Sequence, residues 1–131
     1  MSKAADLANL IGNINAGGGG VNRNLIINGA MSVSQRGTSF ADPSNDDYVL
    51  DRFIARKSND GAVTITQDSS GPSGFANSLK VDVTTADTSI GASQFSILQY
   101  KVEAQDLQTL AFGTSDAKNF TLSFYVKSNK T

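Results

Sequence analysis

Strict alternation of apolar and polar side chains in two segments limits what this chain can fold into. In residues 79–84 and again in residues 120–127, every second side chain is Leu, Val or Phe, and polar side chains or Tyr stand between them. Successive side chains of a β-strand point to opposite faces, so this pattern is typical of strands that bury one face and expose the other. The two segments predict strands over 79–84 and 120–126.

Shorter apolar runs predict further strands between turn sequences. The expected turns are Asn28-Gly29, residues 59–61 and residues 71–74, which are rich in Asn, Asp, Gly, Pro or Ser. Residues 104–112 favour one helical turn, with Leu107 and Leu110 toward the core. The weaker predicted strands cover residues 25–27, 30–35, 48–56, 62–67 and 95–103. Six or seven strands separated by turns predict a mainly β domain over 24–131, a jelly-roll-like two-sheet β-sandwich.

The first part of the chain has a different period. Its apolar side chains recur at spacings of three and four, which places them on one side of an α-helix within residues 1–16. A helix this short is unstable alone in water, so its apolar stripe must pack on a partner. Gly17 to Gly20 follow, and a tether is expected over residues 17–23 because glycines have no side chains to bury. The residues expected to anchor or oligomerise the chain are Leu7, Leu10, Ile11 and Ile14.

The carboxyl end of the predicted sandwich looks incomplete. A jelly roll has about eight strands, whereas the last predicted strand ends at Val126 and the sequence ends at Thr131. Either the chain is a truncated piece of a longer protein, which we favour, or neighbouring chains supply the missing strands. Open strand edges together with a lone amphipathic helix predict a homo-oligomer, and a trimer would bury three helix stripes against one another.

Missing residue types exclude most enzyme mechanisms. The chain has no histidine and no cysteine, and Glu103 is its only glutamate. Catalytic triads, imidazole acid–base catalysis and thiolate zinc sites therefore cannot form. A glycosidase that uses two carboxylates is disfavoured because no convincing pair is present. We expect the chain not to be an enzyme.

The charge distribution argues against nucleic acid and membranes as partners. The 12 acidic and 11 basic residues nearly cancel, and no run of like charge stands out. No stretch approaches the roughly 18 apolar residues of a membrane span, and the first residues lack the apolar run of a signal peptide. The sequence predicts a soluble protein made in a cytoplasm.

One acidic cluster offers oxygen ligands of the kind that calcium prefers. Asp42, Asp46 and Asp47 lie close together in the sequence, near Asn45 and Asp51. The spacing fits no defined calcium loop, and the same composition is typical of an ordinary surface loop. We favour a surface loop as the interpretation of this cluster, and a calcium site is the alternative. No other cofactor is expected.

Three tyrosines and an arginine are candidates for saccharide binding. Sugar rings stack their apolar faces on exposed aromatic rings, while charged and amide groups bind the hydroxyls. Each tyrosine can equally be a sandwich residue with its hydroxyl at the rim, which is the favoured interpretation. The candidates are Tyr48, Arg52, Tyr100 and Tyr125.

Several segments resemble a family of tail-fibre and virion structural proteins of marine tailed bacteriophages. Residues 24–39, NLIINGAMSVSQRGTS, resemble the family's opening, whose usual form is N-L-I-N-G-x-M-x-V-x-Q-R-G-T-S. The resemblance continues at 48–53, 99–103 and 120–128, and residues 2–8 resemble the start of such fibres. Phe53 and Tyr125 stand where relatives commonly have tryptophan, so a tryptophan sugar platform does not carry over.

The resemblance implies a jelly roll similar to carbohydrate-binding modules, in a homotrimeric fibre. It implies a virion structural protein, the amino-terminal part of a tail fibre, which attaches the fibre to a tail adaptor or nozzle protein. Such a protein is made in the host cytoplasm and resides in the virion tail. The alternatives are a lectin-like domain that binds host-surface glycans and, third, a glycan depolymerase.

Overall fold

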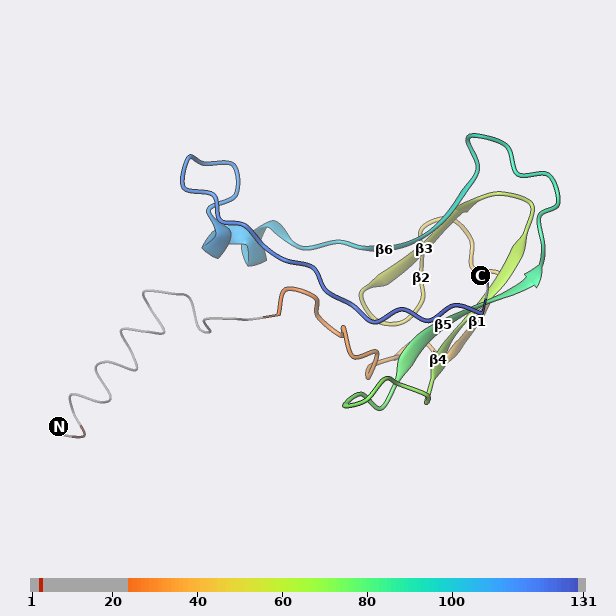
Figure 1. Ribbon diagram of the computed structural model, residues 1–131, viewed down its shortest axis with the longest axis horizontal. Coiled ribbons are helices and arrows are strands. Elements are labelled where there is room, and N and C mark those ends of the chain that lie inside the picture. Colours follow the sequence, from red (N-terminus) through yellow and green to blue (C-terminus); the bar gives the residue numbers. More distant parts are fainter. Residues whose placement is uncertain (1–2, 4–23, 130–131) are drawn as a thin grey trace. The chain divides into compact units, whose positions relative to one another are not determined.

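The computed structural model describes Lys3 and residues 24–129, and this part of the chain is mainly β (Figure 1). The predicted helix and tether lie outside the described residues, apart from Lys3. The chain divides into two units: Ile26–Lys101 holds all the strands, and a second unit contains the 3-10 helix η1 and the residues after it. The elements are β1 (Ser39–Ala41), β2 (Asp47–Tyr48), β3 (Phe53–Ser58), β4 (Ala62–Asp68), β5 (Ser78–Thr85), β6 (Phe95–Tyr100) and η1 (Ala104–Leu110).

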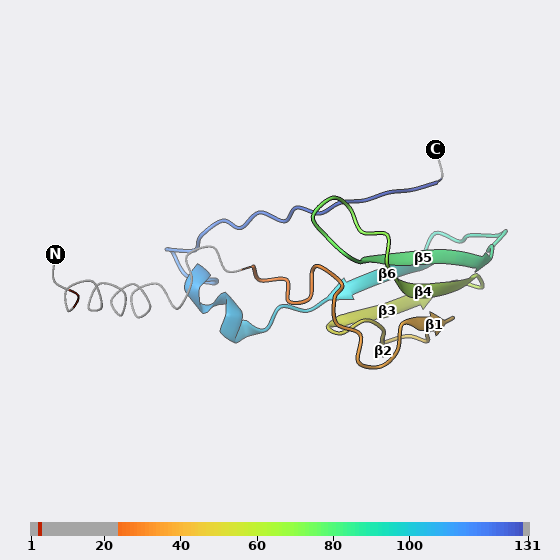
Figure 2. The same cartoon turned by 90° about the horizontal axis from the view of Figure 1, so that it is seen from below.

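The strands form two three-stranded antiparallel sheets. One has the order β1-β4-β5 and the other β2-β3-β6, so β4 and β3 are the central strands. Figure 2 shows β1 and β2 at one side of this pair of sheets and β5 and β6 at the other. The mainly β class is confirmed.

A small apolar core joins the two sheets. Leu50 and Val49, in the bend between β2 and β3, are fully buried, and Phe53 and Ala55 of β3 and Ile65 of β4 complete the cluster. Burying apolar side chains between two sheets is the main stabilising contribution for such a domain. The core therefore lies nearest the bend that precedes β3.

The strands predicted over 25–27 and 30–35 are wrong, because a turn held by one side chain takes their place. Asn28, with φ 60°, accepts the Val33 N–H at Oδ1 and donates from Nδ2 to the carbonyls of Val33 and Asp51, at 2.9–3.0 Å. An Asn side chain that binds nearby backbone groups competes with a sheet ladder. The predicted turn at Asn28 is confirmed, but no strands flank it.

The other strand predictions have mixed outcomes. Those over 62–67, 79–84 and 95–103 correspond to β4, β5 and β6, whereas 48–56 is broken into β2 and β3 by the bend at Val49 and Leu50. The helical turn predicted over 104–112 is η1. No strand is assigned in residues 119–128, so the strand predicted over 120–126 is not observed in the described part of the chain.

The turn over 71–74 depends on a close backbone approach. A Cβ atom placed on Gly71 would collide with the carbonyl group of Phe75 and would also meet the carbonyl oxygen of Asn77 at 2.9 Å. The Phe75 N–H donates to the Pro72 carbonyl at 2.9 Å and closes the turn. This turn leads into β5.

Substitution of Leu50 should destabilise the fold strongly. Leu50→Ala removes fully buried methyl groups at the centre of the core, and we expect a loss of about 2–5 kcal/mol in the free energy of unfolding. Urea denaturation measures this loss. Ile90→Ala, at a loop position that is 75% exposed, is the matched control and should change the free energy by less than about 0.5 kcal/mol.

The side chain of Asn28 should contribute to the free energy of unfolding, in addition to the left-handed backbone conformation of this residue. Asn28→Gly keeps the positive φ but removes the three hydrogen bonds, and we expect it to cost about 1–3 kcal/mol in urea denaturation. Asn28→Ala should cost more, because alanine strains the left-handed backbone. Equal stability of Asn28→Gly and the unchanged protein would show that these hydrogen bonds contribute nothing.

Candidate functional site

The apolar core does not extend to the edge strand β5, where the inner side chains are much more exposed than on β4. Ile65 of the central strand β4 is 4% exposed, but Val81, its direct partner on β5, is 48% exposed. Directly paired residues share a face of the sheet, so Val81 points to the same inner side as Ile65. Val83, next along this face, is 55% exposed. The inner face of β5 is thus apolar and half uncovered.

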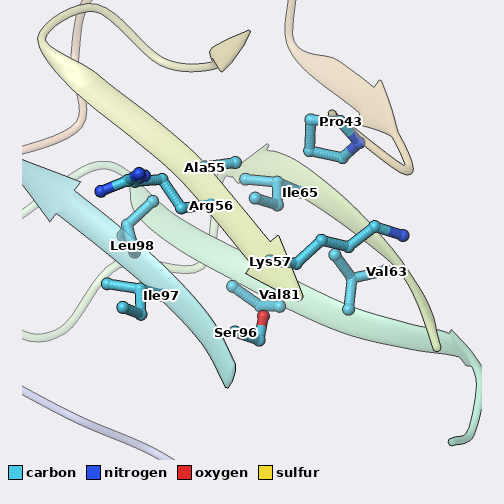
Figure 3. Close-up of a pocket in the computed structure, with 10 residues that line it drawn as sticks. All are labelled: Pro43, Ala55, Arg56, Lys57, Val63, Ile65, Val81, Ser96, Ile97 and Leu98. Carbon is cyan, nitrogen blue, oxygen red and sulfur yellow. The ribbon is translucent and has the colours of Figure 1, made fainter. Parts of the chain in front are cut away.

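The inner face of β6 is uncovered in the same way. Leu98 pairs with Ala55 of β3, and exposure rises from 5% at Ala55 to 39% at Leu98. Figure 3 shows that Val81 and Leu98 line one hollow between the sheets, together with Ile65 of β4 and Ile97 of β6. We call the half-covered inner side chains of these two strands, Val81, Val83 and Leu98, the open side of the sandwich.

The hollow is too small to bind a sugar ring. Its volume is about 30 Å³, roughly the share of one water molecule in the liquid, whereas ligand pockets usually have about 300–1,000 Å³. Its lining is mostly aliphatic. An apolar surface of this kind fits another protein segment better than a polar small molecule.

Two charged residues of β3, Arg56 and Lys57, also line the hollow (Figure 3). Lys57 donates from Nζ to a carboxylate oxygen of Asp42 and, at 2.9 Å, to the Gly61 carbonyl. The hydrogen bond from Lys57 lowers the pKa of Asp42 below its usual 3.8, with the positive charge and the Val63 N–H adding to the effect. Asp42 therefore stays ionised at neutral pH.

The aspartates that sequence analysis singled out for calcium have protein partners. Asp42 binds Lys57, Asp46 lies 3.0 Å from Arg56 Nε, and Asp47 accepts the Ser44 N–H at 2.7 Å. Over residue 3 and residues 24–129, no three acidic side chains are grouped in a way that could hold a metal ion. Each of the three carboxylates therefore binds a group of the protein itself.

Two of the saccharide candidates, Tyr48 and Tyr100, do not face the same side of the sheet. Tyr48 pairs with Ile54 and Tyr100 with Phe53, and neighbouring β3 residues point to opposite faces, so the two tyrosines lie on opposite faces of the sheet. The Tyr100 ring packs on Phe53 at 5.4 Å, its hydroxyl accepts the Ile27 N–H, and Arg52 lies over it at 5.9 Å.

The remaining two aromatic candidates are more exposed. Tyr48 is half exposed, but the Arg36 guanidinium stands 5.1 Å from its ring centroid in a cation–π contact. Tyr125 is 75% exposed and belongs to the other unit. Arg52 and Tyr100 are in contact, and that contact is part of the packing at the end of β6.

Sequence reasoning missed the open side as a site. The signal was present in residues 95–98, where Phe95, Ile97 and Leu98 put apolar side chains on both faces of one strand. Such a run is typical of a strand that is covered on both sides. The run therefore predicts that another segment covers β6, but it does not identify that segment.

Comparisons with known proteins do not add to this description. No protein-family model matches the chain, and searches of curated proteins and of solved structures give no match. In the part of the chain that the structure describes, no helix has the length and hydropathy needed to cross a membrane.

The pairing of Asp42 with Lys57 should be visible in a pH titration. Because the folded-state pKa of Asp42 is lowered, its stabilising effect is present above about pH 3.8 and is lost as the pH falls toward the folded pKa. Lys57→Met should raise the pKa of Asp42 toward 3.8, measured from carboxyl-carbon chemical shifts. Lys101→Met, a control at an exposed position, should leave it unchanged.

Proposed function

We propose that this protein is a virion structural protein, the amino-terminal part of a bacteriophage tail fibre that attaches the fibre to the tail. The observation that carries the proposal is the open side of the sandwich, where apolar side chains of the two edge strands β5 and β6 are half uncovered. A surface of this kind is typical of a chain that completes its fold by assembly. The resemblance of residues 24–39 to phage fibre proteins supports the same assignment.

The sandwich is proposed to be part of a jelly roll. Its six strands in two antiparallel sheets are fewer than the roughly eight of that fold. Additional strands at β5 and β6 would extend both sheets and cover the hollow between them. Neighbouring chains or further residues of the full protein would supply those strands.

Attachment is proposed to run through the apolar stripe of the first 16 residues. Burial of Leu7, Leu10, Ile11 and Ile14 against partner helices or an adaptor protein can contribute roughly 1.5–3 kcal/mol per side chain. The tether would let the sandwich adopt its own orientation relative to that anchor.

Oligomeric state tests this proposal directly. We expect sedimentation equilibrium of the protein at micromolar concentration to give a trimer, and Leu10→Asp to weaken it, because a charge in the stripe opposes burial. Asp6→Lys, which changes a charge outside the stripe, is the control. A stable, soluble monomer would contradict the assembly role, and selective binding on a glycan array would favour the host-attachment alternative instead.

A further inference from the structure

The sequence contains a single asparagine that is followed by glycine, in the pair Asn28-Gly29. The backbone nitrogen of the residue after an asparagine can attack the carbonyl carbon of the side-chain amide, and glycine has no side chain to hinder this approach. A new C–N bond closes a five-membered succinimide, and ammonia leaves with the proton of the attacking N–H. Water then opens the ring and leaves aspartate or isoaspartate. Asparagine is one of the thermolabile residues of proteins, and at Asn28 this reaction is the least hindered in the chain.

In the folded turn, hydrogen bonds hold both ends of the Asn28 amide. Oδ1 accepts the Val33 N–H at 2.9 Å, and Nδ2 donates to the carbonyls of Val33 and Asp51 at 2.9 and 3.0 Å. The Met31 N–H donates to the Asn28 carbonyl at 2.9 Å and fixes the backbone of the same turn. Ring closure must turn the side-chain amide toward the Gly29 nitrogen, and this movement breaks its hydrogen bonds. The reaction therefore requires the turn to open first.

We propose that Asn28 is a modification site, at which succinimide formation proceeds while the turn is locally open and is suppressed while it is closed. Local opening of a surface turn needs much less free energy than unfolding of the whole domain. Gly29 is exposed and the Val33 side chain is 44% exposed, so this turn lies at the surface. Water, the second reactant, therefore reaches the open turn without unfolding of the core.

Deamidation would prevent the turn from closing again in the same form. An aspartate at position 28 can still accept the Val33 N–H, but its second carboxylate oxygen replaces the Nδ2 donor. That oxygen would face the carbonyl oxygens of Val33 and Asp51, and none of these three oxygens can donate a hydrogen bond. Isoaspartate also lengthens the backbone of the turn. The change is therefore retained, and modified copies accumulate with time.

The turn fastens a segment that helps to cover the core. Met31 packs against the buried cluster, and its carbonyl accepts a hydrogen bond from Gln67 Nε2 of β4 at 2.6 Å. The bond from Asn28 to the Asp51 carbonyl joins this segment to the bend before β3. All four residues belong to the unit Ile26–Lys101. Modified copies should therefore be less stable than unmodified ones.

Peptide mapping of the full chain by mass spectrometry measures the reaction, because chromatography separates the aspartate and isoaspartate products at position 28. The unaltered protein is incubated folded and in guanidinium chloride, at the same mildly alkaline pH. We expect deamidation to be roughly tenfold or more slower in the folded protein, the factor that a few net hydrogen bonds provide. Equal rates in the two states would overturn the proposal.

A matched pair of variants tests the hydrogen bonds themselves. Val33→Pro removes the N–H that Asn28 Oδ1 accepts, whereas Val33→Ala keeps it. We expect folded Val33→Pro to deamidate roughly fivefold faster than folded Val33→Ala, the factor for one hydrogen bond. Equal rates would show that the hydrogen bonds do not control the reaction. If Val33→Pro does not fold, the comparison of folded and denatured unaltered protein still decides.

Two further variants test the nucleophile and the consequence. A Cβ at Gly29 would lie 3.4 Å from Ile26, an ordinary contact, so Gly29→Ala should fold and should deamidate much more slowly in guanidinium chloride. An unchanged rate would exclude the Gly29 nitrogen as the nucleophile. Asn28→Asp, which has the sequence of one product, should lower the ratio of folded to unfolded protein roughly tenfold. Unchanged stability would show that the modification does not loosen the turn.

Discussion

The shared core between two three-stranded sheets is the constraint on which the rest of this fold depends. Neither sheet is large enough to bury an apolar face alone, because a few strands need a packing partner for stability. The bend at Val49 and Leu50 places two fully buried side chains where the sheets meet, and Phe53 and Ile65 pack beside them. On the edge strands β5 and β6 the inner side chains are less covered, with Val81 48% and Leu98 39% exposed.

Of the two period-two patterns, that of 79–84 predicted β5, whereas that of 120–126 predicted a strand that is not observed among the described residues. The strands β4 and β6 were predicted from shorter apolar runs between turn sequences. The prediction over 25–35 failed because Asn28 ties its own loop to Val33 and Asp51, a local interaction that an apolar run does not reveal. β1 has three residues and too few apolar side chains to be recognised.

Residue type gave candidates for the sites but not their geometry. The aspartates near residue 45 predicted a surface loop, with calcium as the alternative, and Lys57 and Arg56, which lie outside that segment, pair with Asp42 and Asp46. Tyr48 and Tyr100 were each candidates for saccharide binding, with a place in the sandwich favoured, and the register of β2 and β6 on β3 puts them on opposite faces of the sheet. The sequence gives the type of each side chain, whereas the pairing register of a strand decides on which face of the sheet that side chain lies and which residues it contacts.

The turn at Gly71 has a consequence for how this protein varies during evolution. Since a Cβ there would meet the Phe75 carbonyl, no other L-residue fits without moving the entry to β5. The neighbouring Ser73 is exposed and carries no such restriction. Sequences that diverge until little similarity remains should therefore keep glycine at this one position while the rest of the turn drifts, and that single residue can align them at the start of β5.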